Sequence, residues 1–392
     1  MRVAMVAAAW EVDVEAQRSH MIDLSEALCA RGHEVVLFLR QHSPVPLQRR
    51  RARQGYQVVR IPAGPTDRLP STRLVPHLDE FAAHLDDHWS GWRPDVVHLR
   101  SWMSALAVGA GHDIPMVQSF HGLGIVEQRF RDTKAQARLD IERRMGAAAG
   151  RILAASTEEV SDLVRMGVPR PRTSLVPCGV DTDLFAPDGP AMRSGGGPRL
   201  LAVGEIRPHS GLDTAISALP MVPRAQLVIA GHVHHSDPRE DPEVKRLVEH
   251  ARRLGVAERV RFTGRIDRRR RPALLRSADI VLCPSWYESL GASALEAMAC
   301  GVPVVASAVG AFNDAVVDEV TGVLVPPRDS RALGVALREL LADNTRRQMF
   351  AIAGVDRIRA RYTWDRVAEE TVIAYGSAIA GSRTRGAAEA RS

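Results

Sequence analysis

The sequence of 392 residues has only 4 cysteines, the residue type that crosslinks small domains and that often binds zinc. Its cysteines are scattered, and none belongs to a Cys-x-x-Cys pair: Cys29, Cys178, Cys283 and Cys300. Their spacing argues against a disulfide framework or a metal site and is typical of a protein of the reducing cytoplasm. No apolar run is long enough to cross a membrane as a helix, and the short apolar run at the start is interpreted as a buried strand.

Lysine and aromatic residues are also scarce. The only lysines are Lys134 and Lys245, so arginine supplies most of the net charge of +6. The arginines cluster at 49–53 and 268–271, while aromatic residues make up 5% of the chain. Arginine clusters without interleaved aromatic residues favour solvated loops, and no nucleic-acid partner is predicted. The charge also suits anionic substrates, and contact with a membrane surface is compatible with it but not required.

What the sequence does contain is a repeated alternation of short apolar strands with amphipathic helices. Strands apolar on both faces that alternate with helices form parallel sheets covered on both sides. The pattern therefore predicts an α/β protein with two doubly wound, Rossmann-like domains, and a ligand at the carboxyl ends of the strands, in the crevice between the sheets. Strands are predicted to begin near Val3, Glu34, Tyr56, Asp95, Pro115, Arg151, Thr173, Arg199, Ala225, Arg259, Asp279, Pro303 and Gly322.

The Gly- and Pro-rich segment 186–199 lacks periodicity and is interpreted as a linker between the two domains. We therefore expect an N-terminal domain over 1–190 and a C-terminal domain over 191–360. An amphipathic helix is predicted over 361–381. The small and polar residues 382–392 are predicted to be a disordered tail.

One stretch places two glutamates around the start of a helix. It reads SWYESLGASALEAMACGVPVVAS over residues 285–307. A strand precedes it, and a helix is predicted from Gly291 to Gly301. The first free amides of this helix lie among small side chains, where an anion can meet the positive end of the helix dipole. Glu288 lies before the helix and Glu296 about one turn inside it, so the two carboxylates bracket an anion site.

Carboxylates beside a phosphate are suited to hydroxyl groups, which donate hydrogen bonds to them. A molecule with hydroxyl groups on both sides of a phosphate is a nucleotide sugar, with ribose on one side and hexose on the other. A purely structural interpretation stays open at this point: Glu288 would then cap the helix, and Glu296 would be a solvated helix residue.

The segment 284–329 resembles the donor-site signature of the retaining GT-B glycosyltransferases of family 4, which has two glutamates separated by seven residues. The resemblance extends over nearly the whole chain, and it implies two domains that face each other across a cleft. It also implies that the helix over 361–381 crosses back to the first domain. The other similar stretches are LSEALCARGHEVVLF, SFHGLG, LVPCGVDTDLFAP, RFTGRIDRRRRPALLRSADIVLCPS and RYTWDRVAEETVIAY.

The resemblance assigns roles to individual residues. The catalytic residues would be Glu288, in contact with the hydroxyls of the transferred sugar, and His121, which would reach the reacting sugar from the first domain. Glu296 would hold the ribose hydroxyls, and the backbone amides of Gly291 and Ala292 would face the diphosphate. The implied reaction is a front-side displacement with retention, in which the leaving diphosphate helps to take the acceptor's proton. The nucleotide sugar is a substrate, and no cofactor or metal is implied.

The resemblance fails where the family binds the diphosphate. The family has Gly-Arg and then Lys-Gly after the first strand of its second domain, whereas this sequence reads VGEIRPHSGLDTAI. Glu205 stands at the arginine position and Ser210 at the lysine position. The loss of two cations should weaken leaving-group stabilisation on the order of a thousandfold in rate. Arg207, His209 and Arg265 are the candidates for a replacement charge, and Arg265 also lies near the expected base contact.

A second departure follows the first strand, where the family often has a Gly-Gly pair and this sequence reads AWEVDVEAQRSH. Trp10, Glu11 and Asp13 would make this acceptor side bulky and acidic. Such a pocket suits a cationic acceptor, such as an aminated sugar or an aminocyclitol. A solvated acidic loop is the alternative.

The sequence therefore predicts a cytoplasmic hexosyltransferase that moves a sugar from a nucleotide-diphosphate sugar to a hydroxyl of a small soluble acceptor. Secondary metabolism, such as antibiotic biosynthesis, is the expected setting. One alternative is transfer to a lipid-linked or cell-envelope glycan. Another is a non-catalytic GT-B scaffold that binds a nucleotide sugar or a partner protein. The altered diphosphate site favours the scaffold, and the retained pair of glutamates favours the enzyme.

Overall fold

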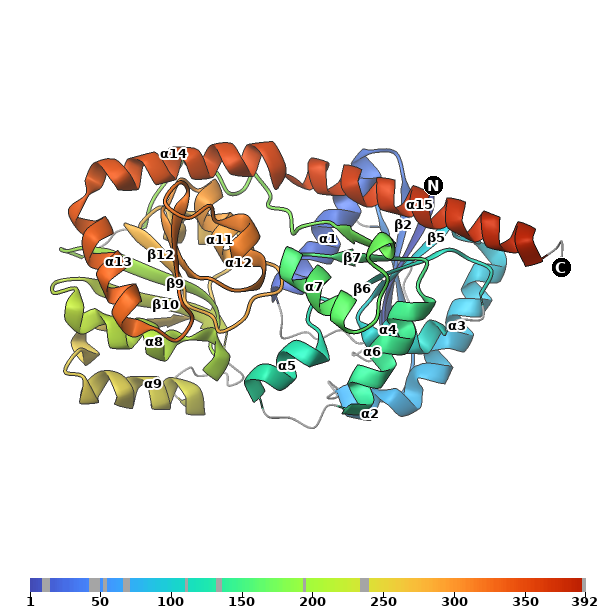
Figure 1. Ribbon diagram of the computed structural model, residues 1–392, viewed down its shortest axis with the longest axis horizontal. Coiled ribbons are helices and arrows are strands. Elements are labelled where there is room, and N and C mark those ends of the chain that lie inside the picture. Colours follow the sequence, from blue (N-terminus) through green and yellow to red (C-terminus); the bar gives the residue numbers. More distant parts are fainter. Residues whose placement is uncertain are drawn as a thin grey trace. The chain divides into compact units, whose positions relative to one another are not determined.

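The computed structural model describes residues 1–8, 15–41, 50–51, 55–65, 71–109, 112–131, 136–192, 195–232 and 240–389. The chain divides into two compact units, one made of Met1–Pro177 with Trp364–Ser392 and the other of Cys178–Thr363. Each unit is a largely or wholly parallel sheet with helices beside it (Figure 1). The predicted α/β class with two Rossmann-like domains is confirmed.

The sheet of the first unit has the strand order β3-β4-β2-β1-β5-β6-β7-β8. The two-residue strand β3, which the sequence did not predict, is antiparallel to β4, and the other pairings are parallel. The strands are β1 (Arg2–Ala7), β2 (Glu34–Arg40), β3 (Arg50–Arg51), β4 (Gln57–Ile61), β5 (Val96–Arg100), β6 (Met116–Ser119), β7 (Arg151–Ala154) and β8 (Thr173–Leu175).

The central strand β1 shows why this sheet is covered on both faces. Val3 and Met5 belong to a core shared with residues of α1 and α15, while Ala4 and Val6 belong to a second core shared with residues of α3 and α4. Successive side chains of a strand point to opposite faces, so an apolar run with no polar alternation requires two covered faces. The helices of this unit are α1 (Glu15–Ala30), α2 (Ser71–Leu74), α3 (Leu78–Gly91), α4 (Trp102–Val108), α5 (Gly124–Arg131), α6 (Gln136–Ala148), α7 (Thr157–Arg165) and α15 (Trp364–Glu389).

The C-terminal helix α15 belongs to the first unit although it follows the second in sequence. Val367 and Tyr375 are buried, and the Tyr375 hydroxyl lies 2.8 Å from Nδ1 of the buried His98 on β5. The helix continues to Glu389, which corrects the prediction of a disordered tail over 382–392; residues 390–392 lie outside the described part. Once the earlier turns are docked, each further residue adds a helical hydrogen bond without a new nucleation step.

The sheet of the second unit has the order β11-β10-β9-β12-β13-β14, and its strands pair in parallel. Each strand predicted after residue 199 is present. The strands are β9 (Arg199–Glu205), β10 (Gln226–His232), β11 (Val260–Gly264), β12 (Ile280–Cys283), β13 (Val304–Ser307) and β14 (Gly322–Val325). The helices are α8 (Leu212–Ala218), α9 (Pro242–Arg253), α10 (Arg271–Leu275), α11 (Ala292–Ala299), α12 (Gly310–Ala315), α13 (Ser330–Ala342) and α14 (Asn344–Arg361).

The boundary between the units lies earlier than the sequence indicated. It falls between Pro177 and Cys178 rather than near residue 190. The intervening segment is fastened to the second unit, because Nη1 of Arg276 donates to the carbonyl of Ala186 at 2.8 Å and the amide of Met192 donates to the carbonyl of Ala273 at 2.8 Å. These hydrogen bonds join residues far apart in sequence, which composition alone does not reveal.

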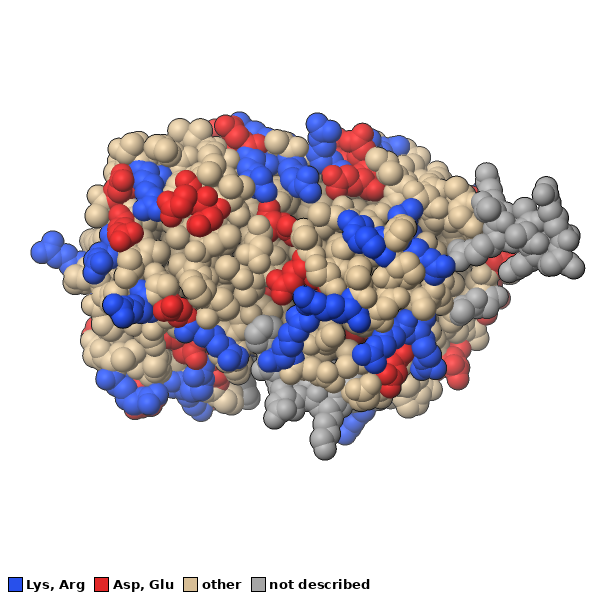
Figure 2. Space-filling view, viewed as in Figure 1, with Lys and Arg blue, Asp and Glu red and all other residues tan. Residues whose placement is uncertain are grey.

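Charged side chains of both signs are interspersed over the face shown in Figure 2. Two arginines of the 268–271 cluster have acidic neighbours, since Arg268 lies 3.8 Å from Asp181 and Arg271 lies 2.8 Å from Glu296. Most of the 49–53 cluster lies outside the described residues. Among the helices that the structure describes, none has the length and apolar character of a membrane span.

Candidate functional site

The loop between β12 and α11 is held tightly around Glu288. Gly310, at the start of α12, lies so close that a Cβ there would come within 1.9 Å of the Glu288 carbonyl oxygen. The amide of Ala311 donates to the same oxygen at 3.0 Å. Only glycine allows this approach, and the resulting contact fixes the backbone at Glu288 against α12.

The Glu288 carboxylate turns back onto the start of α11. Its Oε1 accepts hydrogen bonds from the amides of Leu290 at 3.1 Å and Gly291 at 3.2 Å. The carboxyl group lies inside although part of the residue is exposed, and this burial raises the pKa of Glu288 while the amide hydrogen bonds oppose the rise. Leu290 and Gly291 precede the first residue of α11, so Glu288 binds the loop in front of the helix and makes no side-chain cap of the helix itself. The Gly291 amide, expected to face a diphosphate, donates to Glu288 here, and Ala292 is the first residue of α11.

Glu296 has a different partner. Nη1 of Arg271, at the start of α10, lies 2.8 Å from its Oε1 and 3.0 Å from its Oε2. Both side chains are 13% exposed, so Glu296 is not a solvated helix residue. This pairing was missed from the sequence, because the two residues belong to separate helices whose contact only the fold creates.

The loop between β9 and α8 carries the departures from the family pattern. The Arg207 guanidinium pairs with the Glu205 carboxylate, with Nε 2.8 Å from Oε2 and Nη2 3.1 Å from Oε1. The Ser210 hydroxyl donates to the Glu205 carbonyl at 2.7 Å and closes the turn. The acid at the expected arginine position is thus neutralised by an arginine two residues later.

The β9–α8 and β12–α11 loops touch each other. The amide of Trp286 donates to the carbonyl of His209 at 2.9 Å, and a Cβ on Gly211 would lie 1.9 Å from the carbonyl oxygen of Pro284. The ring of His209 stacks on that of Tyr287, with centroids 5.8 Å apart. This contact brings Glu205, Arg207 and Ser210 beside the loop of Glu288, as the sequence predicted for one site.

Two residues near this loop contact were missed from the sequence. The guanidinium carbon of Arg328 lies 3.8 Å from the ring centroid of Trp286, a cation–π contact. The Trp-Tyr pair directly before Glu288 was a usable signal, since large aromatics in a loop usually have a packing partner. By contrast, Arg265 is exposed after the end of β11, with β10 and β9 between that strand and β12.

The predicted first-domain residue His121 follows β6 in a strained conformation. Its φ is 51°, and Ser101, which follows the neighbouring strand β5, has a φ of 90°. Non-glycine residues in this region cluster at functional sites. The residue is partly exposed, but both nitrogens of its ring are buried. This burial, together with the positive charge of Arg100, holds the pKa of His121 well below its usual range. The imidazole is therefore neutral at neutral pH. The ring of His20 lies 5.0 Å away.

The loop that carries His121 is held by a buried ion pair on α6. The Glu142 side chain is fully buried and accepts the amide of Gly124 at 2.9 Å. Arg138 lies 2.7 Å from Glu142 and donates to the carbonyl of Gly122 at 2.8 Å. Burial raises the pKa of Glu142, and the Arg138 guanidinium opposes that rise. The two side chains thus bind backbone groups on the residues that follow His121.

The predicted acceptor-side residues Trp10, Glu11 and Asp13 lie outside the described residues. Within the described part of the chain, no group of three or more His, Cys, Asp or Glu side chains is arranged to hold a metal ion.

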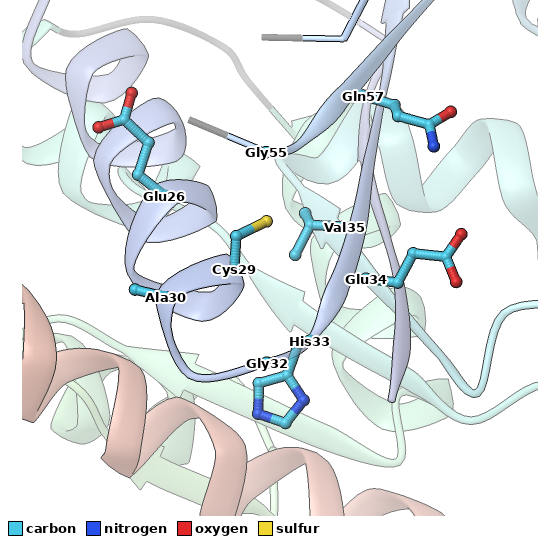
Figure 3. A pocket seen from close by; sticks show the side chains of 9 residues that line it. All are labelled: Glu26, Cys29, Ala30, Gly32, His33, Glu34, Val35, Gly55 and Gln57. Carbon is cyan, nitrogen blue, oxygen red and sulfur yellow. The ribbon is translucent and has the colours of Figure 1, made fainter. Parts of the chain in front are cut away.

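A surface pocket of about 730 Å³ lies in the first unit near the amino ends of β2 and β4, whereas His121 follows the carboxyl end of β6. Its wall includes Glu26 on α1, and Glu34 and Gln57 on the strands. Figure 3 shows the polar end of Glu26 directed away from those of Glu34 and Gln57, so they do not converge on a common point. The pocket is therefore unlike the loops after β9 and β12, which are joined by a backbone hydrogen bond and a ring contact.

Comparison with known proteins decides the family. Residues 17–184 match Glycosyltransferase Family 4, and residues 192–357 match Glycosyl transferases group 1. A D-inositol 3-phosphate glycosyltransferase of Xylanimonas cellulosilytica is 34% identical and covers 93% of this chain and 92% of its own. The chain belongs to the family 4 glycosyltransferases. A glycogen synthase of Mycobacterium tuberculosis is 30% identical to this glycosyltransferase, over 98% of this chain and 96% of its own.

Solved structures confirm that this glycosyltransferase has the GT-B fold. A sucrose-phosphate synthase from Thermosynechococcus elongatus superposes with a TM-score of 0.85 at 27% identity and covers 97% of this chain and 99% of its own. Anabaena HepE, solved in complex with UDP and glucose, has a TM-score of 0.73 at 18% identity over 96% of this chain and 100% of its own. The second likeness concerns the fold alone.

Proposed function

We propose that this glycosyltransferase moves a sugar from a nucleoside diphosphate sugar to a hydroxyl group of a small, soluble, polyhydroxylated acceptor, with retention at the anomeric carbon. The observation that carries the proposal is the start of α11, where Glu288 lies at the helix N-terminus and Glu296 lies about one turn inside. The four cysteines form no disulfide, which is consistent with the cytoplasmic setting that we propose.

The donor would use two kinds of group in the second unit, backbone amides and carboxylates. The helix start supplies amides and a positive dipole end for the diphosphate. Glu288 would accept hydrogen bonds from the transferred sugar, and Glu296 from the ribose. Carboxylates that accept from hydroxyls give charge-assisted hydrogen bonds, which are stronger than neutral ones.

The proposed step is a front-side displacement at the anomeric carbon. The bond from that carbon to the diphosphate oxygen breaks, the bond to the acceptor oxygen forms, and the acceptor's proton passes to an oxygen of the leaving diphosphate. His121 would contact the reacting sugar as a neutral imidazole, because its pKa is held low. The neutral imidazole would add a hydrogen bond to the sugar and would bring no positive charge to it.

The diphosphate site has less positive charge than the family pattern provides. Arg207 remains the proposed replacement cation, but its guanidinium is shared with Glu205, and the pair has no net charge at neutral pH. The Ser210 hydroxyl is used within the loop. Stabilisation of the leaving group would therefore depend mainly on the amides of α11 and on how far Arg207 turns toward the phosphates.

The relatives support a cyclitol or sugar as the acceptor. The Xylanimonas relative is named for D-inositol 3-phosphate, and the Mycobacterium relative is named for glycogen synthesis. We place a cyclitol-like acceptor first, because the relative named for it has the higher identity. An aminated sugar or aminocyclitol, as in antibiotic biosynthesis, is the form suggested by the acidic residues after β1.

The test is a matrix of donors and acceptors. UDP-, GDP- and ADP-sugars are each incubated with myo-inositol, an inositol monophosphate, an aminocyclitol, a maltooligosaccharide and a polyprenyl phosphate in detergent, and products are identified by mass spectrometry. NMR of the anomeric proton then gives the configuration. We expect a glycosylated cyclitol whose anomeric configuration matches that of the donor.

Other results would correct the proposal in defined ways. An inverted product would exclude retention. Transfer only to the maltooligosaccharide or the polyprenyl phosphate would replace the small soluble acceptor by a polymer or a lipid-linked glycan. Calorimetric binding of a nucleotide sugar with neither hydrolysis nor transfer would favour the non-catalytic scaffold, which the Glu205–Arg207 pair makes worth testing.

A further inference from the structure

The contact between Arg271 and Glu296 joins two helices that are not adjacent in sequence. Arg271 is the first residue of α10, and Glu296 lies in the second half of α11. A single nitrogen, Nη1, lies within hydrogen-bond distance of both carboxylate oxygens, at 2.8 and 3.0 Å. With both side chains 13% exposed, the carboxylate is held by a cation in a largely water-excluded position.

An ion pair of this kind limits the orientation of the carboxylate. A glutamate side chain has three torsions, and its carboxyl group otherwise samples several rotamers. A carboxylate has about four lone-pair positions, and contacts from one nitrogen leave acceptor positions for other donors. The guanidinium therefore fixes the plane in which the remaining lone pairs of Glu296 lie.

From this geometry we infer that Arg271 is a positioning residue that holds the Glu296 carboxylate in the orientation that accepts the ribose hydroxyls of the donor. The inference rests on the proposed function, because it concerns the carboxylate to which the ribose is assigned. Arg271 itself touches Glu296 and acts on the nucleotide through it.

A purely structural role for the pair is the competing explanation. In that case Arg271 would only brace α10 against α11, and its loss would lower stability without changing how the ribose is recognised. The two explanations differ in one measurable quantity: the ratio of the dissociation constants of a 2′-deoxy nucleoside diphosphate and its ribo form. Unfolded protein changes the apparent stoichiometry of binding but not this ratio.

The experiment is calorimetric titration of UDP, ADP and GDP, each with its 2′-deoxy form, into the wild-type chain and into Arg271→Met. We expect the wild-type chain to bind the ribo form of its preferred nucleotide on the order of tenfold more tightly, because one charge-assisted hydrogen bond is lost with the 2′-hydroxyl. In Arg271→Met we expect this ratio to fall below about threefold. Should that variant not fold, the uncharged Arg271→Gln makes the same prediction.

Two further variants test whether the change in this ratio is due to the contact between Arg271 and Glu296. Arg269→Met makes the same chemical change at an exposed position in the same arginine cluster, and it should leave the ratio at the wild-type value. In a Glu296→Gln background, Arg271→Met should have no further effect on the ratio, since the group that Arg271 orients is already changed.

The outcomes separate this inference from the proposed function. An unchanged or increased ratio in Arg271→Met would overturn the inference alone, and so would a further loss in the Glu296→Gln background. A wild-type chain that binds none of the nucleotides, or binds ribo and deoxy forms equally, would remove the assignment of Glu296 to the ribose and the inference with it.

Discussion

One glutamate, Glu205, ends β9 and another, Glu288, lies in the loop after β12, and the charges of the two are compensated in different ways. Oε1 of Glu288 accepts hydrogen bonds from the amides of Leu290 and Gly291, just before α11. Glu205 pairs with Arg207 in its own loop. Backbone amides are fixed dipoles that carry no net charge, whereas an arginine is a full charge that a phosphate could also use. The negative charge of Glu288 is therefore not paired with a cation by these two hydrogen bonds, whereas that of Glu205 is paired with Arg207.

The same contrast occurs in the first unit. Glu142 is paired with Arg138, whereas Glu159 on α7 accepts the amide of Ala155 at 2.7 Å. Burial raises the pKa of Glu159 to about 7, and the amide hydrogen bond only partly opposes the rise. Both carboxyls accept a backbone amide, and Glu142 has in addition the Arg138 guanidinium, which opposes the rise of its pKa.

The largest expected effect is on Glu288. Glutamine at this position can still accept hydrogen bonds from the amides of Leu290 and Gly291, so the loop is kept while the negative charge offered to the sugar is lost. We expect Glu288→Gln to lower kcat/KM on the order of a thousandfold, about 4 kcal/mol. Steady-state kinetics with the identified substrates measures it. Glu249→Gln, an exposed change on α9, is the control and should have wild-type kinetics. A Glu288→Gln enzyme with near wild-type turnover would remove Glu288 from the catalytic residues.

The next effect is on stability and depends on pH. The folded-state pKa of Glu159, about 7, lies above its ordinary value of 4.5, so between these pH values the folded chain binds more protons than the unfolded chain. Stability is therefore lost as pH rises through this window. Glu159→Gln should stabilise the first unit by about 3 kcal/mol at pH 8 and by little at pH 4.5.

Calorimetric unfolding of wild type and Glu159→Gln at both pH values tests this prediction. Asp140→Asn, at an exposed acid on α6, is the matched control, because a change there should be small at either pH. Equal effects of Glu159→Gln at pH 8 and pH 4.5 would mean that the carboxyl is not protonated on the acid side of this window.

A smaller effect is expected from the Arg138–Glu142 ion pair, which binds the backbone of the residues that follow His121. Arg138→Met removes the hydrogen bond to the Gly122 carbonyl and leaves Glu142 without its guanidinium. We expect kcat to fall about tenfold while the donor KM changes little, because His121 is displaced but the second unit is intact. Arg143→Met, at an exposed arginine on the same helix, should have wild-type kinetics. If the donor KM changed as much as kcat, the Arg138–Glu142 ion pair would not act through His121.

The smallest effect has the opposite sign and tests the comparison directly. Glu205→Gln removes the charge that competes for Arg207, so the guanidinium can turn toward the diphosphate. We expect kcat/KM to rise about threefold to tenfold, near 1 kcal/mol. Arg207→Gln should lower it, alone and together with Glu205→Gln. If Glu205→Gln lowers kcat/KM as Arg207→Gln does, then Glu205 orients Arg207 instead of restraining it.

The strands and the central loop of the site were predictable because their signals are local. Apolar runs bounded by turn residues located the strands, and the sequence around Glu288 predicted helix α11. The boundary at Pro177 was not predictable, because hydrogen bonds from Arg276 and Met192 to distant carbonyls decide it. The extension of α15 through residues 382–389 was missed because composition suggested a polar tail.

The alternation of strand and helix in two domains follows from the sequence alone, and so do the loop of Glu288 and the helix that contains Glu296. It also showed that two expected cations are absent after β9. The partner of each carboxylate is set by the fold: the amides of Leu290 and Gly291 for Glu288, Arg271 for Glu296 and Arg207 for Glu205. Residue type sets the charge of a side chain, but its partner depends on which helices and loops pack within a few ångströms of it. Packing between separate elements is a property of the folded chain.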